Sequence, residues 1–322
     1  MPVKKPHEGL GNNIMTAQIF IDGAAGTTGI EIAERLGGRT DVALITLADA
    51  DRKDDAKRRE ALNAADLVIL CLPDEAAIEA VAMIDNPQTR VIDASSAHRV
   101  APGWTYGFAE FRKGQREAIG NARFVSNPGC YPSGFLALVA PLVAAGLLPA
   151  NGRYSVNAVS GYSGGGKGLI QRFHNESDIA FRTYGLGLAH KHLPEMQVHA
   201  GLAHAPLFAP SVIPAFRGML IEVPVMGAKV DAAAMRAALA AHYADESLVV
   251  VDSAAAPDEL LIRDGATPDD GLSLHIFGDP HGEQARLIAI LDNLGKGASG
   301  ACVQNMNLML GLPEYEGLRL QG

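Results

Sequence analysis

One cysteine stands in a setting that favours nucleophilic chemistry. Cys130 lies between two prolines in the segment SNPGCYPS (126–133), directly before an apolar helix that we expect to start near Ser133. A helix N-terminus favours the thiolate, which is the nucleophilic form of cysteine. The other cysteines, Cys71 and Cys302, lie in apolar segments and are expected to be inert core residues. We therefore predict that Cys130 is a nucleophile, with an inert core cysteine as the alternative.

Two neighbouring histidines supply a candidate proton carrier. His190 and His192 stand in HKHLPE, before a helix predicted over 193–203, and the same segment carries Glu195. Imidazole changes charge near neutral pH, so we assign His192 as the acid or base and His190 as its support, with a structural histidine as the alternative. The spacing is not the i, i+4 pair of a zinc helix and no cysteine is close, so we expect no metal.

A glycine-rich turn predicts a nucleotide-phosphate site. The segment GAAGTTG (23–29) stands between an apolar strand over 17–21 and an amphipathic helix that ends near residues 37–38. Glycines at such a turn let the backbone approach a pyrophosphate, and the helix N–H groups face the anion. The spacing is GxxGxxG rather than GxGxxG, and a tight turn without a ligand is the alternative.

The residues after the second strand bear on the kind of dinucleotide. Asp49 and Asp51 are followed by Arg52 and Lys53. An acid at this point binds the ribose hydroxyls of NAD, whereas an arginine or lysine pairs with the 2′-phosphate of NADP. The pattern is mixed, and a solvated turn is the alternative.

Two further segments are suited to hold an anion. GYSGGGKG (161–168) nearly matches the phosphate loop GxxxxGK[ST], but Gly168 lacks the hydroxyl that binds magnesium, which disfavours an NTPase. Its glycines and Lys167 suit an anionic substrate or a cofactor ring, with a flexible turn as the alternative. Arg99 ends DASSAHR (93–99) at the carboxyl edge of the predicted sheet, where a guanidinium can clamp a phosphate or carboxylate. A surface arginine is the alternative there.

Strands that alternate with helices must position these groups. The pattern indicates a doubly wound, Rossmann-like parallel sheet, with strands over 17–21, 42–47, 67–72 and 91–94 and helices over 54–64 and 76–83. After a helix over 133–145 strands dominate, which indicates an α+β domain built on a mixed or antiparallel sheet. These later strands are predicted over 154–160, 211–213, 219–224, 248–251, 272–277 and 285–291. A last helix over 297–312 is expected to return to the first domain.

Composition excludes several classes of protein. The net charge of −9 disfavours binding to nucleic acid or an anionic membrane, because both need a basic face. Three scattered cysteines indicate a reducing compartment, and no uncharged apolar run approaches the roughly 20 residues of a membrane span. We therefore expect a cytoplasmic protein. Residues 1–14 are polar and are expected to be a leader or an alternative start.

Six motifs together resemble one enzyme family. GAAGTTG, DASSAHR, VSNPGCYPSG, GYSGGGKG, AHKHLPE and DNLGKGASGACVQNMNLMLG follow in order over nearly the whole chain. They resemble the N-acetyl-γ-glutamyl-phosphate reductases in their short bacterial form, a family similar to aspartate-semialdehyde dehydrogenase and glyceraldehyde-3-phosphate dehydrogenase. Leu138 departs from the family's usual small residue. The stretch between Leu47 and Leu67 is shortened, so the adenosine pocket transfers least directly.

The resemblance implies a mechanism and a set of site residues. Cys130 would form a thioester from the acyl phosphate, NADPH would reduce it to the semialdehyde, and His192 would move the proton, as a step of arginine biosynthesis. The implied substrate-binding residues are Arg99, Ser163, Lys167, His190 and Glu195. The implied cofactor-binding residues are Gly23, Gly26, Thr27, Thr28, Gly29, Arg52, Leu72, Pro73, Ser95 and Asn305.

The same resemblance implies a division of the chain. Residues 15–131 and 296–322 would bind NADP, and residues 132–295 would form the catalytic and dimerisation domain of a homo-oligomer, a dimer or a tetramer. Three alternatives stay open. They are a reductase of another acyl phosphate such as aspartyl phosphate, a cofactor-free Cys/His hydrolase or acyltransferase, and a nicotinamide-sensing binding protein without a reactive thiol.

Overall fold

The first sheet is parallel and carries the nucleotide-binding turn. The computed structural model describes residues 16–227, 230–252 and 257–320, so the predicted leader, 1–14, lies outside it. The strand order is β2-β1-β3-β4-β6-β5, and all neighbours are parallel. The strands are β1 (Ala17–Asp22), β2 (Val42–Ile45), β3 (Leu67–Leu70), β4 (Arg90–Asp93), β5 (Thr105–Tyr106) and β6 (Phe124–Ser126).

Helices cover the first sheet because its central strands are apolar on both faces. All four residues of β3 are buried, as a strand between two layers of helices requires. The helices are α1 (Thr27–Leu36), α2 (Asp55–Ala64), α3 (Asp74–Ala82) and α4 (Gln115–Asn121). Asp54 caps α2, where its carboxylate accepts the backbone N–H groups of Ala56 and Lys57. The predicted doubly wound sheet is confirmed.

The second sheet is mixed, in the order β11-β12-β13-β10-β7-β9-β8. β7 pairs with β9, and β11 with β12, in parallel; the other neighbours are antiparallel. The strands are β7 (Ser155–Gly161), β8 (Arg182–Thr183), β9 (Leu207–Ile213), β10 (Met219–Met226), β11 (Val249–Val251), β12 (Leu272–Gly278) and β13 (Gln284–Leu291). The predicted mixed sheet is confirmed.

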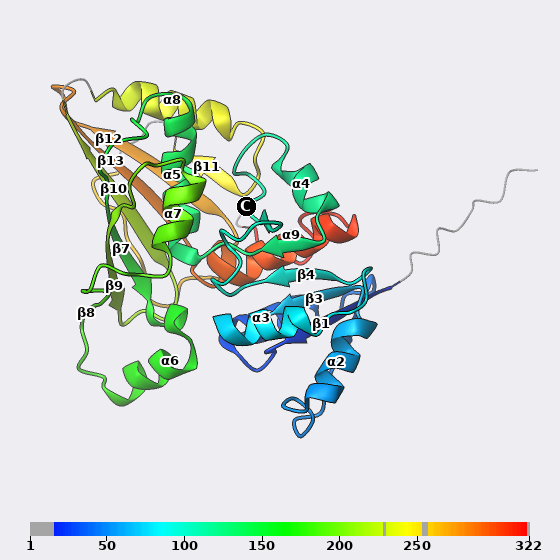
Figure 1. Ribbon diagram of the computed structural model, residues 1–322. Coiled ribbons are helices and arrows are strands. Elements are labelled where there is room, and N and C mark those ends of the chain that lie inside the picture. Colours follow the sequence, from blue (N-terminus) through cyan, green and yellow to red (C-terminus); the bar gives the residue numbers. More distant parts are fainter. Residues whose placement is uncertain (1–15, 228–229, 253–256, 321–322) are drawn as a thin grey trace, which may run out of the picture.

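Two helices cover one face of the second sheet. Residues along β10 alternate between buried and partly exposed, so one face of the strand packs inward. α5 (Cys130–Ala144) contacts β10 and β13, and α8 (Ala232–His242) contacts β12 and α5 (Figure 1). Because the strands hold α5 along its length, they fix the position of its first residue, Cys130.

The end of the chain returns to the first sheet. After β13 a π-helical turn (Gly295–Ser299) leads into α9 (Gly300–Leu310), which Figure 1 shows in red beside β4. Cys302 and Met306 on α9 belong to the same buried cluster as Ile19 and Ile69 of the sheet. Among the described helices, none is long and apolar enough to cross a membrane.

Three local predictions need correction. The helix α5 begins at Cys130 rather than near Ser133, because Pro132 falls in the first turn, where a missing N–H costs nothing. Of the segment 161–168 only Gly161 is non-helical. The rest forms a 3₁₀ turn (Tyr162–Gly165) and the start of α6 (Gly166–Asn175). The predicted helix 193–203 is α7 (Leu193–His199), which ends before Gly201 at φ +67°.

Candidate active site

Cys130 is the first residue of α5, with Gly129 as the N-cap. The backbone around the cysteine is crowded. A Cβ built on Gly129 would lie 2.8 Å from His192 Nε2, so glycine lets the imidazole approach this turn. A Cβ on Gly297 would lie 2.9 Å from the Cβ of Cys130, so the π-helical turn closes on the cysteine from the other side. The thiol therefore lies where the two sheets and the end of the chain meet.

A cavity of about 700 Å³ surrounds Cys130 and joins the two domains. Its wall contains most of the residues predicted from sequence. It includes the predicted catalytic residue His192, and from the substrate-binding group Arg99, Ser163, Lys167 and His190. From the cofactor-binding group it includes Gly26, Thr27, Thr28, Leu72 and Pro73. The first sheet thus brings the glycine turn to the same space into which the second sheet brings the histidines.

The thiol of Cys130 is not activated in advance. Burial raises the pKa of Cys130 to about 11, although Arg99 and the backbone N–H groups of Tyr131 and Cys130 act to lower it. This corrects the expectation that the helix N-terminus favours the thiolate of Cys130. The loss of hydration outweighs both effects, because the thiol lies largely within the protein at the cavity wall.

His192 is a neutral imidazole beside the cysteine. Burial lowers its pKa well below the ordinary value, and the charges of Arg99, His190 and Lys191 lower it further. Its Nδ1 finds no hydrogen-bond partner among the described residues, and only 6% of the residue is exposed. The Nδ1 of His190 accepts the backbone N–H of His192 at 3.2 Å. A neutral imidazole next to a thiol is suited to accept a proton.

Glu195 connects three elements and does not face the cavity. Its carboxylate accepts the Gly129 N–H at 2.8 Å, the Tyr106 hydroxyl at 2.6 Å and Arg99 Nη1 at 2.9 Å, and only 1% of the residue is exposed. From the sequence we expected Glu195 to bind the substrate. In the structure it holds the turn before Cys130 and fixes Arg99. Tyr106, on the two-residue strand β5, has no sequence motif that would have identified it.

Arg99 lies in the cavity wall, and three of its guanidinium N–H groups already donate hydrogen bonds within the protein. Besides Glu195, Nε donates to the carbonyl of Asn127 and Nη2 to that of Ala94, each at 3.1 Å. The sequence predicted that Arg99 would clamp a phosphate or carboxylate with a free guanidinium. In the structure the guanidinium is not free, because Glu195 and two backbone carbonyls already bind it. The guanidinium instead supplies a fixed positive charge next to Cys130, with two N–H groups not used in these bonds.

The glycine turn is built for close approach of a ligand. Gly23 has φ +88°, and a Cβ there would collide with the carbonyl of Cys71. A Cβ on Gly29 would lie 2.6 Å from the carbonyl oxygen of Gly23, so Gly29 serves tight packing of helix and turn. The hydroxyl of Thr27 is buried and unpartnered among the described residues. An orphaned donor at the start of α1 fits a phosphate oxygen.

A second cavity, of about 470 Å³, continues from this turn along β1 and β2. Gly23, Leu72, Arg52 and Lys53 line it, and so does Arg58, which sequence analysis did not single out. Arg58 pairs with Asp22 at 2.9 Å, whereas Arg52 pairs with the exposed Asp49 at 2.8 Å. The pocket wall therefore carries more positive than negative charge, with Arg52, Lys53 and Arg58 against Asp22.

Three predicted cofactor residues lie outside both cavities: Gly29, which packs against the glycine turn, and the more distant Ser95 and Asn305. Ser95 is buried, and its hydroxyl donates to Asp93 at 2.7 Å within the turn that leads to Arg99. Asn305 is buried on α9, where its Nδ2 donates to Asn127 Oδ1 at 3.0 Å and to the carbonyl of Gly107 at 2.8 Å. Asn127 itself lines the large cavity. Ser95 and Asn305 shape the site from behind its wall.

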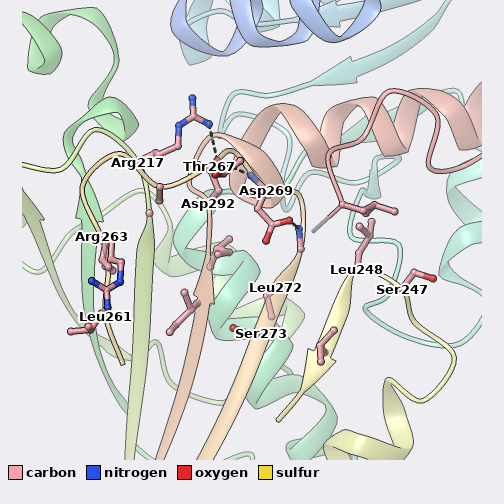
Figure 2. Close-up of a pocket in the computed structure, with 18 residues that line it drawn as sticks. Arg217, Ser247, Leu248, Leu261, Arg263, Thr267, Asp269, Leu272, Ser273 and Asp292 are labelled. Carbon is pink, nitrogen blue, oxygen red and sulfur yellow. Dashed lines mark hydrogen bonds and ion pairs between the residues drawn. The ribbon is translucent and has the colours of Figure 1, made fainter. Parts of the chain in front are cut away.

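Another cavity, of about 390 Å³, is lined in part by residues of β11, β12 and β13, and Cys130 is not in its wall. Figure 2 shows this cavity. Its wall contains neither histidine nor cysteine and none of the predicted site residues. Figure 2 shows Arg217 directed at Asp292, and the two are paired at 2.8 Å. We therefore place the chemistry in the cavity around Cys130. No group of three metal-ligating side chains occurs among the described residues.

Two family models match the chain. One, described as "Semialdehyde dehydrogenase, NAD binding domain", covers residues 18–122, and the other, "Semialdehyde dehydrogenase, dimerisation domain", covers residues 130–293. The solved structure of aspartate semialdehyde dehydrogenase II from Vibrio cholerae superposes with a TM-score of 0.68. It is 18% identical and covers 92% of this chain and 99% of that chain. At this identity the likeness shows the fold alone.

Curated relatives are much more similar in sequence. N-acetyl-gamma-glutamyl-phosphate reductase 2 of Nostoc sp. is 50% identical over 320 residues, which cover 94% of this chain and 99% of the relative. N-acetyl-gamma-glutamyl-phosphate reductase of Rhizobium etli is 50% identical over 309 residues, which cover 92% of this chain and 99% of the relative. The nucleotide-binding match supports a nicotinamide cofactor and an oxidoreductase, against a cofactor-free acyltransferase. The chain belongs to the N-acetyl-gamma-glutamyl-phosphate reductase family.

Proposed function

We propose that this protein reduces N-acetyl-γ-glutamyl phosphate to N-acetylglutamate semialdehyde with NADPH, as a step of arginine biosynthesis. One observation carries the proposal: a single cavity contains a thiol at a helix N-terminus, a neutral histidine, a fixed arginine and a glycine turn. That set matches covalent acyl transfer next to a nicotinamide cofactor. The names of the relatives agree with this substrate.

Cys130 and His192 would carry the covalent step. His192, being neutral, takes the thiol proton as the sulfur attacks the acyl carbon. The backbone N–H groups of Cys130 and Tyr131 lie in the first turn of α5, without intrahelical acceptors, and would stabilise the oxyanion. Phosphate then leaves and a thioester remains on Cys130. Arg99 and Lys167 offset the charge of the phosphate in the cavity.

The glycine turn and the cavity along β2 would hold the dinucleotide. Three features support binding of the dinucleotide here. They are the tight backbone turn at Gly23, the Thr27 hydroxyl that lacks a partner among the described residues, and the positive charge of Arg52 and Arg58. When bound, the cofactor supplies the hydride that reduces the thioester carbon. His192 would return its proton as the product aldehyde is released from Cys130. The charge near β2 supports NADP rather than NAD.

We also propose the assembly and location that sequence analysis suggested. Residues 15–131 with 296–322 would form the NADP-binding domain, and residues 132–295 the catalytic domain of a homo-oligomer in the cytoplasm. The description of the second family model, a dimerisation domain, supports the oligomer. The packing of α9 against β4 and α4 supports including the end of the chain in the first domain.

The direct test uses the reverse reaction. Purified protein is mixed with NADP, inorganic phosphate and either N-acetylglutamate semialdehyde or aspartate semialdehyde, and NADPH is followed by absorbance. We expect phosphate-dependent NADPH formation with the N-acetylated aldehyde and a much lower kcat/KM with the other. Preference for aspartate semialdehyde would contradict the proposed substrate, and turnover without phosphate would contradict the acyl-phosphate chemistry.

A further inference from the structure

His199 binds the backbone of Arg99 from outside the cavity wall. It is the last residue of α7 and lines none of the cavities described above. Its Nε2 lies 2.7 Å from the backbone carbonyl oxygen of Arg99. A carbonyl oxygen only accepts, so Nε2 must carry the hydrogen of this bond. Burial lowers the pKa of His199 below its ordinary value, so the ring is neutral and this one donor is fixed.

The ring of His199 also stacks on Tyr106. The ring centres are 3.8 Å apart, and the ring planes are inclined by 23°. The Tyr106 hydroxyl donates to Glu195 at 2.6 Å, and Glu195 in turn accepts Arg99 Nη1 at 2.9 Å. These four residues therefore form a closed circuit of contacts. Within it His199 holds the backbone of Arg99, and Glu195 holds its guanidinium.

The circuit joins the two domains beside the turn that carries the thiol. Two of its members, Arg99 and Tyr106, belong to the part of the chain that forms the first sheet. The other two lie on α7, which packs against α5 (Figure 1). The guanidinium has little free space, because a Cβ built on Gly129 would collide with Arg99 Nη1. A small displacement of Arg99 would therefore change its position relative to Cys130.

Packing alone does not account for these contacts. A side chain that only filled the space beside Tyr106 would need no hydrogen bond to Arg99, and a phenylalanine would serve as well. Instead the imidazole N–H and the Tyr106 hydroxyl are directed at Arg99 and at its partner Glu195. The charge of Arg99 acts to lower the pKa of Cys130. The circuit is therefore placed to set the position of that charge.

We propose that His199, together with Tyr106, is a positioning residue for Arg99 and holds its guanidinium beside Cys130 and the departing phosphate. Where the inference concerns phosphate it rests on the proposed function and deepens it, whereas its part concerning the thiol needs no substrate. Without the N–H of His199, the backbone of Arg99 is free to shift. The interaction of its charge with a thiolate or a phosphate then weakens with distance.

Two substitutions separate the hydrogen bond from the stacking. His199→Phe keeps a ring against Tyr106 but has no donor for the Arg99 carbonyl. His199→Gln loses the ring, but its side-chain amide can donate from about the position of Nε2. In the reverse reaction His199→Phe should raise the KM for phosphate roughly 3- to 10-fold. The KM for NADP should not change, because the cavity along β2 does not include Arg99. His199→Gln should restore most of the loss.

A second measurement does not depend on turnover. In the free protein at about pH 8, iodoacetamide should alkylate Cys130 roughly two- to threefold more slowly in His199→Phe, because the thiolate is less stabilised. Tyr106→Phe keeps the ring but loses the bond to Glu195, and it should slow alkylation by a similar factor. This variant tests the circuit even if His199→Phe does not fold, and an unchanged alkylation rate in it would count against the proposal.

His242→Phe is the matched control. His242 also ends a helix and contacts a tyrosine ring, Tyr243, with 4.6 Å between ring centres, but it lines none of the cavities described above. This variant should change neither the phosphate KM nor the alkylation rate.

Unchanged values of both quantities in His199→Phe would overturn the positioning role. A His199→Gln variant as impaired as His199→Phe would also overturn it, because His199 would then only pack. If the unsubstituted protein has no phosphate-dependent activity but His199→Phe still slows alkylation, the proposed function fails and the positioning role stands. If the protein is active and His199→Phe changes neither quantity, only the positioning role fails.

Discussion

At Cys130 burial and charge act in opposite directions. Burial raises the pKa of the thiol to about 11, while the fixed charge of Arg99 acts to lower it. His192 cannot help as a cation, because burial keeps its pKa well below the ordinary value. The thiolate must therefore form as its proton moves to His192, rather than persist beforehand. A thiol kept protonated until substrate arrives is protected from oxidation and stray alkylation.

This balance predicts the pH dependence of alkylation. Iodoacetamide reacts with the thiolate, so its rate with Cys130 in the free protein should rise about tenfold per pH unit between about pH 7 and 10. The direction follows from a pKa raised above the ordinary value by burial. Mass spectrometry of the peptide that contains Cys130 gives the rate. A plateau near pH 8 would mean that the thiol is activated in the free protein.

The two neighbouring histidines should differ in importance. His192→Asn should lower kcat by roughly 10²- to 10⁴-fold, the usual worth of a positioned acid or base, while Cys130 remains open to alkylation. His190→Asn should have a milder effect, because His190 orients the backbone of His192. Turnover and labelling are measured in parallel for both variants. If His190→Asn is the crippling change and His192→Asn is near normal, the assignment within the pair is reversed.

At the scale of elements, the apolar patterns predicted most of the long strands and most helices, but only the last three residues of β9 and none of α4, α6 and α8. The run Leu67–Leu70 and the apolar stretch after Cys130 are strong local signals. The two-residue strands β5 and β8 carry no such signal, because pairing with β6 and β9 makes them strands. The contact between Glu195 and the Gly129 N–H joins residues 66 positions apart, which no local pattern encodes.

The connection between β2 and α2 should set the choice of cofactor. Arg52 lines the cavity along β2, with its side chain 48% exposed. Arg52→Ala should raise the KM for NADPH more than that for NADH, because only NADPH carries the 2′-phosphate. Arg59→Ala is the control, since Arg59 on α2 pairs with Asp85 and lies outside that cavity. Equal effects on the two cofactors would remove Arg52 from the phosphate site.

The π-helical turn under Cys130 depends on a buried ion pair. Lys296 donates to Glu110 at 2.7 Å and to Gln304 on α9 at 2.8 Å, and Glu110 is fully buried. Burial raises the pKa of Glu110, but Lys296, Gln304 and Arg116 together hold it below the ordinary value. A lowered pKa means that this stabilisation is present above the unfolded-state pKa and is lost as the pH falls through the folded-state pKa.

Removing that lysine should therefore destabilise the fold. Lys296→Met leaves the carboxylate of Glu110 buried without its partner and should cost about 3–5 kcal/mol of unfolding free energy at neutral pH. The cost should shrink at acidic pH, where Glu110 becomes protonated. Lys57→Met is the control, because the pair of Lys57 with Glu60 is exposed and should contribute under about 0.5 kcal/mol. Urea unfolding at neutral and acidic pH measures the unfolding free energy of both variants. A loss of stability in Lys296→Met that does not depend on pH would contradict the role of the ion pair.

At the scale of the whole molecule, the site exists only where three parts of the chain meet. The parallel sheet supplies the glycine turn and Arg99, the mixed sheet holds α5 and α7, and the segment after β13 closes under Cys130. Figure 1 shows α9 lying between the two sheets, so the last segment of the chain completes a site begun near its start. Sequence motifs identified most of these groups, but their convergence on one cavity depends on long-range packing.

The central claim is that acyl transfer passes through a thioester on Cys130. The most direct measurement mixes the protein with NADP and N-acetylglutamate semialdehyde in the absence of phosphate and follows NADPH in the first turnover. The account predicts a burst of about one equivalent of NADPH per active site, an acyl group on the Cys130 peptide by mass spectrometry, and its release when phosphate is added. A Cys130→Ser variant that still forms NADPH, or a burst without an acylated Cys130, would contradict it.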